Sequence, residues 1–256
     1  MATTDEGGTE AETATDWTGQ PFSCQDCPHA ALRAGGRCML GRICVRDQRS
    51  RRIDRFFARN PDFAGDYIDH LYFEVRALAA KYASPFQIVG LMKDREPEVR
   101  AMAALRLPIP RVRQMRADRA RAVRIACALR LEGADLLALA HDTDEHVRLT
   151  VARRLDPALL PVMIRDPSAT VRRSLITRLP PARLFGLLQD EDPLVRREAA
   201  ERVAPAALGL LVKDPDLRVR FVVADRAPRE ITLRLIDDAD PEVRARARER
   251  GAEIKP

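Results

Sequence analysis

Hydrophobic and polar residues follow one another along most of this chain in a pattern that returns at one fixed interval. A valine followed by an arginine marks each return, at Val75, Val99, Val123, Val147, Val171, Val195, Val219 and Val243. The interval of twenty-four positions contains no insertion or deletion, so about eight copies of one structural unit cover residues 70–256. Such a strict period is typical of a solenoid, in which each unit buries its apolar face against its neighbours.

Each unit contains the pattern of one α-helix that begins just before the valine. An aspartate suited to capping a helix stands three residues before the valine in four units, at Asp144, Asp192, Asp216 and Asp240. In residues 147–155, apolar side chains recur four, five and eight residues after the valine, on one helical face. Prolines such as Pro157 and Pro180 end the helix, and the remainder has room for one or two turns, which we expect to be 3₁₀ helix. The fold class predicted is all-α.

Two charged columns keep the same register. An aspartate precedes the valine by five residues at Asp94, Asp118, Asp142, Asp166, Asp190, Asp214 and Asp238. A second arginine follows the valine by seven residues at Arg106, Arg130, Arg154, Arg178, Arg202, Arg226 and Arg250. Because acids and bases recur in step, we expect ion pairs between neighbouring units. The alternative is a basic groove for an acidic partner or nucleic acid.

The composition supports helices and divides the chain by charge. Hydrophobic residues make up 46% of the chain and aromatic residues only 5%, which favours helices over a β-sandwich. Residues 1–21 hold five acids and no base, and we expect them to be an acidic disordered tail. The rest of the chain holds all 44 lysines and arginines and the other 33 acids, which gives it a formal charge of +11.

No segment has the features of a secretory signal or of a membrane span, so we expect a cytoplasmic protein with no membrane association. The five cysteines are odd in number, and four of them lie between positions 24 and 44. This distribution argues against a secreted disulfide scaffold and for a bound metal.

The four-cysteine domain predicted over residues 22–52 has the spacing C-x2-C-x10-C-x5-C, formed by Cys24, Cys27, Cys38 and Cys44. Four thiolates suit either a tetrahedral zinc ion or an iron-sulfur cluster. Pro28 directly after the second cysteine favours the cluster, and the absence of a second C-x2-C knuckle counts against zinc. Both metals, and cysteines that bind none, stay open on spacing alone.

Other residues near this domain have plainer interpretations. His29 lies beside the cysteines, but four thiolates leave no vacant ligand position for it. Arg33, Arg37, Arg42 and Arg46 either stabilise a reduced cluster or face solvent. Residues 53–69 are expected to cap the first unit with aromatic side chains, part of a set comprising Phe56, Phe57, Phe63, Tyr67, Tyr72, Phe73, Tyr82 and Phe86.

Features of an enzyme are missing from the sequence. His141 and His146 lack the H-E-x-x-H frame, and no glycine-rich phosphate loop occurs. Cys127 falls in an apolar column of the repeat, four residues after Val123, and is expected to be a buried thiol. We therefore expect a binding protein and no catalytic residues.

The unit VRxxxAxRLPxxxLxxLxxDxDPx, preceded by the four-cysteine segment, resembles the leucine-rich repeat variant proteins with an N-terminal iron-sulfur cluster. The resemblance extends from Cys24 to the end of the chain. It implies a right-handed solenoid of alternating α and 3₁₀ helices, with a small [4Fe-4S] domain on its N-terminal end. The cluster ligands of the family correspond to Cys24, Cys27, Cys38 and Cys44. The first unit departs from the pattern at His70 and Tyr82, and the third departs at Glu132 and Gly133.

The family has no established biochemical activity, and some members occur near nitrogen-fixation genes. Our first hypothesis is a redox or oxygen-sensing [4Fe-4S] element on a monomeric solenoid that binds an unidentified protein. The resemblance alone implies a further hypothesis, an accessory to nitrogen fixation. The alternative hypothesis is a nucleic-acid-binding basic solenoid with a structural zinc or cluster site.

Overall fold

The computed structural model of the protein describes residues 14–25 and 27–253. These residues form α-helices and 3₁₀ helices, here labelled η, joined by short turns. No β-strand occurs in the described ranges, which contain only isolated bridges between Thr15 and Pro21 and between Met39 and Ile43. The chain divides into two compact units, Met1–Leu131 and Glu132–Pro256.

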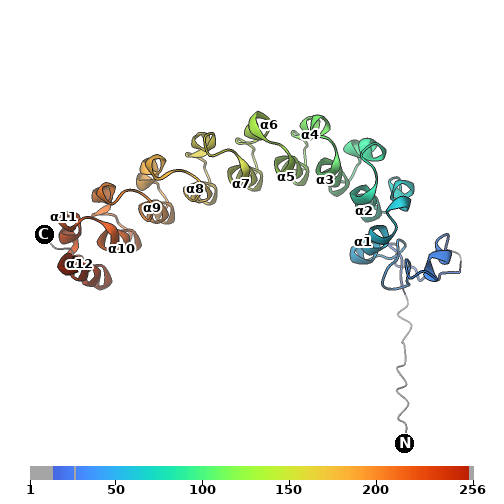
Figure 1. The fold of residues 1–256 in the computed structure, drawn as a ribbon, viewed down its shortest axis with the longest axis horizontal. Coiled ribbons are helices and arrows are strands. Elements are labelled where there is room, and N and C mark those ends of the chain that lie inside the picture. Colours follow the sequence, from blue (N-terminus) through green and yellow to red (C-terminus); the bar gives the residue numbers. More distant parts are fainter. Residues whose placement is uncertain (1–13, 26, 254–256) are drawn as a thin grey trace, which may run out of the picture. The chain divides into compact units, whose positions relative to one another are not determined.

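The first unit contains the cysteine domain and the first repeats. Its α-helices α1, α2, α3 and α5 pack against one another in chain order (Figure 1). Shorter helices connect them and lie along the opposite side of the row. The elements are η1 (Ala30–Arg33), α1 (Ser50–Arg59), η2 (Pro61–Tyr67), α2 (Phe73–Tyr82), η3 (Gln87–Lys93), α3 (Pro97–Arg106), α4 (Ile109–Met115) and α5 (Arg121–Arg130).

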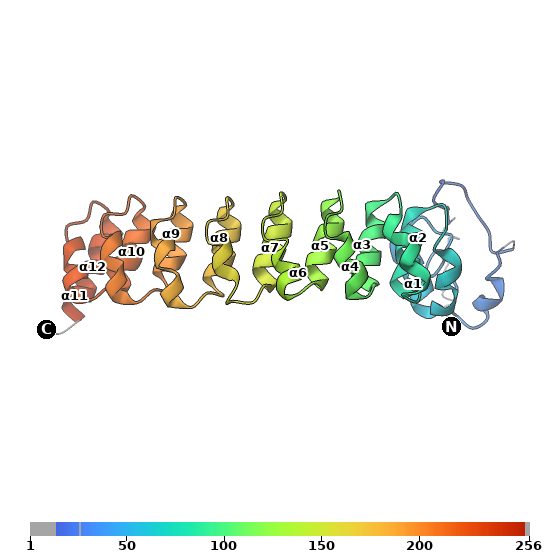
Figure 2. The same cartoon turned by 90° about the horizontal axis from the view of Figure 1, so that it is seen from above.

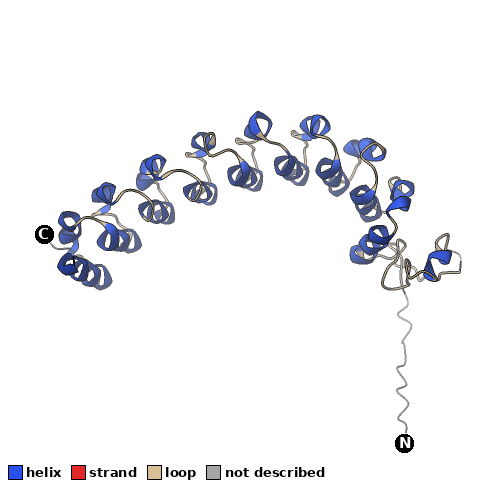
Figure 3. Ribbon diagram, in the orientation of Figure 1, coloured by secondary structure: helices blue, strands red, loops and turns tan. Residues whose placement is uncertain are grey.

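The second unit continues the same alternation. Helices α7, α8, α9, α10 and α12 form one row, and each packs against the next (Figures 2 and 3). The elements are α6 (Gly133–Leu137), α7 (Glu145–Arg154), η4 (Leu160–Met163), α8 (Ala169–Ile176), η5 (Pro181–Arg183), η6 (Phe185–Gln189), α9 (Pro193–Ala200), η7 (Pro205–Leu211), α10 (Leu217–Arg226), α11 (Arg229–Thr232), η8 (Leu233–Leu235) and α12 (Pro241–Glu253).

The repeat pattern predicts the core correctly. All eight valines of the Val-Arg pairs are fully buried. The apolar residues four and eight positions later, such as Val151 and Leu155, are fully buried as well. The predicted helical face is thus the face that packs against neighbouring repeats, and the all-α repeat fold is confirmed. One detail differs, because the short second element is 3₁₀ in some repeats and contains a brief α-helix in others, namely α4, α6 and α11.

The starts of the helices follow their capping residues. The side chains of Asp144, Asp192, Asp216 and Asp240 accept hydrogen bonds from backbone N–H groups of the first turn, as predicted. Ser168 caps α8 in the same way, which the aspartate pattern had not indicated. Glu96 makes no side-chain cap, which agrees with its expected weakness.

Arginine and aspartate join consecutive repeats through a contact that recurs at one fixed separation along the chain. Arg148 donates from Nε and Nη2 to the two carboxylate oxygens of Asp166, at 2.8 and 3.1 Å. Its Nη1 donates to the backbone carbonyls of Asp142 and Thr143, and Asp166 also accepts the Ser168 N–H at 2.8 Å. The same bidentate pair forms in Arg76–Asp94, Arg100–Asp118, Arg172–Asp190, Arg196–Asp214 and Arg220–Asp238.

These pairs are buried. The side chains of Arg148 and Asp166 are 9% and 3% exposed. The Asp166 carboxylate raises the pKa of Arg148. In another pair of the same kind, the Arg220 guanidinium holds the pKa of Asp238 below its usual value. The predicted ladder of ion pairs between neighbouring units is therefore confirmed.

Arginines of the second column also make contacts with the preceding repeat. Arg106 donates to the carbonyl of Ala83, and Arg178 donates to that of Ala152 at 2.6 Å. These carbonyls lie at the end of the preceding α-helix, where the backbone has no partner of its own within the helix. The hydrogen bonds of Arg130 and Arg226 follow the same rule. Hydrogen bonds to the preceding repeat thus hold these members of the column, although Arg106 itself stays exposed.

The two atypical repeats keep the same local geometry by other means. In the first, His70 Nδ1 accepts the Tyr72 N–H at 3.1 Å, the bond that an aspartate oxygen accepts elsewhere. Tyr82, at the position of the second arginine, donates instead to Asp54 at 2.9 Å. In the third, Gly133 replaces the proline corner with a φ of 53°, a conformation that glycine adopts without strain.

Substitution of Arg148 by alanine tests the ladder. We expect a loss of about 3–5 kcal/mol in the free energy of unfolding, because Asp166 is left buried without its partner. Arg153→Ala, on the same helix, removes an exposed arginine and should change stability by less than about 1 kcal/mol. Urea unfolding followed by circular dichroism measures both values. Equal effects of the two substitutions would contradict a structural role for the buried pair.

Candidate metal centre

Residues 14–21, which the sequence placed in a disordered tail, pack against the cysteine domain. The Gln48 N–H donates to the Thr15 carbonyl at 3.1 Å, and the Gln48 side chain donates to the Thr15 hydroxyl at 2.7 Å. The Trp17 ring stacks on Tyr72, with ring centroids 5.7 Å apart and planes 10° apart. Residues 14–21 therefore make backbone, side-chain and ring contacts with later parts of the chain. Residues 1–13 lie outside the described ranges.

The first two cysteines occupy a turn that leads into η1. The Cys27 N–H donates to the Cys24 carbonyl at 3.4 Å, and the Ala30 N–H donates to the Cys27 carbonyl at 3.0 Å. Both thiols are partly exposed. Leu32 in η1 is buried and fixes this turn to the rest of the domain.

The second two cysteines flank a tight hairpin. Met39 and Ile43 exchange both backbone hydrogen bonds at 2.8 Å, so the residues on either side of them, Cys38 and Cys44, come together. Gly41 closes the turn with a φ of 70°, in the left-handed region that favours glycine. The five-residue gap between these cysteines is therefore the length of the hairpin. Both thiols are buried.

Helix α1 and the residue after it hold this hairpin in place. Arg59 Nη1 donates to the Gly36 carbonyl at 2.6 Å, and the buried Asn60 donates from Nδ2 to the Arg37 carbonyl at 2.9 Å. At the other end of the hairpin, the Cys44 N–H donates to the Arg52 carbonyl at 3.2 Å. No sequence pattern singled out Asn60 beforehand, although its position directly after a helix is one where side chains often bond to backbone.

Electrostatic interactions connect the four thiols. A hydrogen bond from Cys44 to Cys38 lowers the pKa of Cys38, and Arg33 lowers it further. The same hydrogen bond, together with burial, raises the pKa of Cys44. Cys24 and Cys27 lie near enough to act on Cys38 in the opposite direction. The hairpin thus pairs Cys38 with Cys44, while Cys24 and Cys27 act on Cys38 through their charge.

The arginines beside the cysteines differ in their positions. Arg33 acts on Cys38 as described, whereas Arg46 lies over the Phe22 ring at 4.8 Å from its centroid. Arg37 and Arg42 are partly or fully exposed. Arg33 is exposed as well, and its positive charge favours a lower pKa of Cys38.

His29 belongs to the aromatic cap. Its ring is buried and lies 4.9 Å from Phe56 and 4.7 Å from Phe63, measured between ring centroids. Its Nε2 is 2.6 Å from the Tyr67 hydroxyl, and burial lowers the pKa of His29. The histidine therefore packs among the aromatic side chains of the cap.

The cap joins the cysteine domain to the first repeat. Phe56 and Phe57 in α1 are fully buried, and the Phe57 ring lies 6.4 Å from Tyr82 of α2. Burial, followed by the nearby Cys27 thiol, raises the pKa of Tyr67 to about 12. One aromatic of the predicted set does not take part, because Phe86 is 91% exposed.

The donor set fits an iron-sulfur cluster or zinc in chemistry, since it consists of four soft sulfur atoms. In the part of the chain that the structure describes, no three cysteine, histidine or acidic side chains converge as a formed metal site. The ligand assignment therefore stays a prediction from the sequence.

The fifth cysteine is separate from this site. Cys127 in α5 is fully buried, and burial raises the pKa of its thiol to about 12. Its sulfur contacts the Val112 carbonyl at 3.6 Å. It packs as part of the repeat core, as the column position predicted.

No helix in the described ranges is both long enough and apolar enough to cross a membrane.

Comparisons with known proteins agree on the two parts of the chain. Residues 14–66 match a family model described as the LRV protein FeS4 cluster. An uncharacterized 27.7 kDa protein in the nifB 3′ region of Rhodobacter capsulatus is 46% identical over 93 residues. That match spans 36% of this chain and 38% of the relative.

A solved structure, described as a leucine-rich repeat variant with a novel repetitive protein structural motif, superposes with a TM-score of 0.82. It is 36% identical in sequence, and the match covers 90% of this chain and 98% of that one.

Proposed function

The chain belongs to the leucine-rich repeat variant proteins, and we propose that Cys24, Cys27, Cys38 and Cys44 hold a [4Fe-4S] cluster. The observation that carries this proposal is the pairing of a C-x2-C turn with a hairpin that places two buried cysteines side by side. When bound, such a cluster supplies one-electron transfer. The family model over residues 14–66 supports an iron-sulfur group in this domain.

The residues around the thiols suit a cluster that responds to its surroundings. Cys24 and Cys27 are partly exposed, so small oxidants and electron carriers can approach one side of the set. Cys38 and Cys44 are buried, and Arg33 provides positive charge near them. Positive charge near a cluster stabilises its reduced form. We therefore propose a redox or oxygen-sensing role, and no catalytic one.

The repeats supply a binding surface in this proposal. The buried arginines and aspartates make contacts between repeats. The exposed side chains of each repeat are not needed for these contacts and can form a surface that matches a partner. We propose that this surface binds another protein. The nucleic-acid alternative has less support, because arginines of both columns make their hydrogen bonds within the array.

A link to nitrogen fixation rests on one relative. The Rhodobacter capsulatus protein is encoded in the nifB 3′ region and is 46% identical over 93 residues. We propose that this chain is an accessory protein of that process.

Metal analysis after anaerobic purification tests the cofactor. We expect about four irons and four acid-labile sulfides per chain and a broad absorption near ~400 nm. Cys38→Ser should lose most of the iron and the band, whereas Cys127→Ser, in the repeat core, should keep both. One zinc per chain and no colour would contradict the cluster and leave the domain a structural cap.

Electrochemistry of the same preparation tests the role. We expect a reversible one-electron couple that disappears in Cys38→Ser. Absence of any couple, in protein that retains its four irons, would contradict the redox role while leaving the cluster in place.

Deletion of the gene in a nitrogen-fixing host tests the accessory role. We expect slower growth on dinitrogen and normal growth on ammonium, with rescue by the wild-type gene and not by the Cys38→Ser variant. Unchanged growth on dinitrogen would contradict this role alone.

A further inference from the structure

The hairpin that joins Cys38 to Cys44 has a partly exposed tip, residues 39–42. Met39 is 41% exposed, whereas Cys38, directly before it, is 4% exposed and Cys44 is 2% exposed. The Arg42 N–H donates to the Met39 carbonyl at 3.1 Å, so the tip is a tight turn. It thus presents an apolar side chain to solvent within one residue of a buried thiol.

Exposed arginines lie along the chain on both sides of Met39. Arg33 and Arg37 precede it, and Arg42 follows it within the tip. The Gly36 N–H donates to the Arg33 carbonyl at 3.0 Å, which holds the first two arginines in one turn. Within the described ranges, none of the three side chains makes a hydrogen bond or an ion pair. Their positive charge is therefore available to a partner.

Few acidic side chains offset this charge. Residues 22–52 contain seven arginines and two aspartates, a formal charge of +5. One of the two, Asp47, is buried and pairs with Arg52 at 3.0 Å. The other, Asp26, lies outside the described ranges. The cysteine domain is therefore basic even when both acids are counted.

The form and charge of the tip match one kind of partner. An apolar centre with a basic rim is a common form of protein interface, in which methionine and arginine are both frequent. Small interfaces are typical of short-lived contacts between electron-transfer proteins. Positive charge favours an acidic partner, because opposite charges speed the encounter. Arg59 and Asn60 hold the hairpin in place, so this surface is formed before a partner arrives.

Arginines would also attract nucleic acid, but the aromatic side chains of the domain do not suit it. Single strands bind proteins by stacking their bases on exposed rings. Phe56 and Phe57 in α1 are fully buried, and Trp17 already stacks on Tyr72. The exposed Met39 beside the buried thiols favours an electron carrier instead, because electrons pass most readily between centres that lie close together.

We propose that residues 39–42, together with Arg33 and Arg37, form the docking surface for an acidic protein that carries a single electron. This inference rests on the proposed [4Fe-4S] function of the four cysteines. In the exchange, the four-cysteine site loses one electron and the metal of the carrier gains it. No bond forms or breaks, and no proton moves.

Stopped-flow mixing of the reduced, metal-loaded chain with oxidised cytochrome b5, an acidic haem protein, tests the proposal. We expect the second-order rate of haem reduction to fall about tenfold or more as salt rises from about 0.01 to 1 M, because the Debye length shortens from about 30 to 3 Å. The rate with cytochrome c, a basic haem protein, should not fall. Equal salt dependence for the two cytochromes would overturn the proposal.

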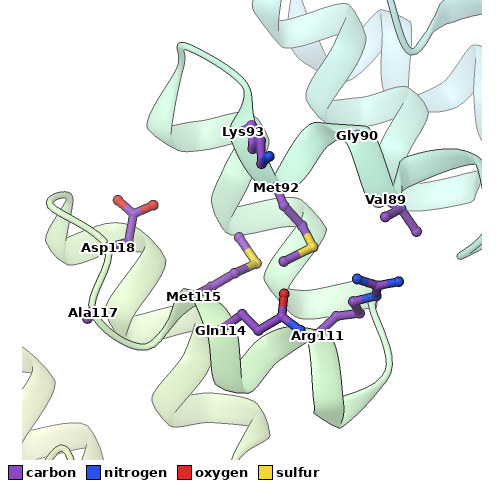
Figure 4. A pocket seen from close by; sticks show the side chains of 9 residues that line it. All are labelled: Val89, Gly90, Met92, Lys93, Arg111, Gln114, Met115, Ala117 and Asp118. Atoms are coloured by element: carbon purple, nitrogen blue, oxygen red, sulfur yellow. The ribbon is translucent and has the colours of Figure 1, made fainter.

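A matched pair of double variants locates the surface. Arg37→Gln with Arg42→Gln removes two charges from the tip and its rim. Lys93→Gln with Arg111→Gln removes two exposed charges from a pocket of about 550 Å³ between η3 and α4, in the repeats (Figure 4). For each variant, the rate with a small neutral quinone corrects for any change in reduction potential. After this correction, the first pair should slow cytochrome b5 reduction about fivefold or more at low salt, and the second less than about twofold. Equal effects would contradict docking at the tip.

Chemical shifts separate docking from electron transfer. Cytochrome b5 labelled with ¹⁵N and titrated with the oxidised chain should show shifted amide signals on its acidic face. The shifts should weaken severalfold with Arg37→Gln and Arg42→Gln. Shifts without any electron transfer would contradict the redox role alone and support the docking surface. Electron transfer without shifts would overturn the docking surface, as would a DNA duplex bound through these arginines while their substitution leaves the cytochrome rate unchanged.

Discussion

The bidentate contact between arginine and aspartate in consecutive repeats is the constraint on which the rest of the array depends. A buried guanidinium and a buried carboxylate are each unfavourable alone, and each becomes acceptable because the other is held in position. The arginine also binds two carbonyls of its own preceding turn, and the aspartate binds the N–H two residues later. One contact therefore fixes the turn, the start of the helix and the distance to the next repeat together.

The repeating part of the fold could be predicted because its information recurs. The valine column predicts the buried face of each helix, and the aspartates three residues before the valines predict where the helices begin. The arginines and aspartates that recur at the same interval predict the ion pairs between repeats. The type of the second helix could not be predicted, since a stretch as short as Ile109–Met115 satisfies either helical hydrogen-bond pattern. His70 shows a further limit. Its ring nitrogen accepts the backbone N–H bond that an aspartate oxygen accepts in other repeats. The presence of a histidine at this position does not by itself predict that bond.

For the cysteine domain, the sequence predicted a set of four thiols suited to a metal, but it did not predict the backbone structure that holds them. The spacing of Cys38 and Cys44 predicts two ligands, but it does not predict the hairpin between them. That hairpin depends on Gly41 and on hydrogen bonds from Arg59 and Asn60 in another part of the chain. His29 and Tyr67 meet although they are far apart in the sequence. Trp17 similarly finds Tyr72 far along the chain. Each of these contacts occurs once, so no repetition reveals it.

The fixed reach of the ladder along the sequence determines how such an array can change in length. A single inserted residue between Arg148 and Asp166 would shift the carboxylate away from its guanidinium and leave two buried charges unmatched. Exposed loops in most proteins absorb insertions easily, but these turns are built into the charge pairing. The array can therefore grow or shrink by duplication or loss of whole repeat modules. The length of the array, and the length of any surface along it, can therefore change only in steps of one repeat.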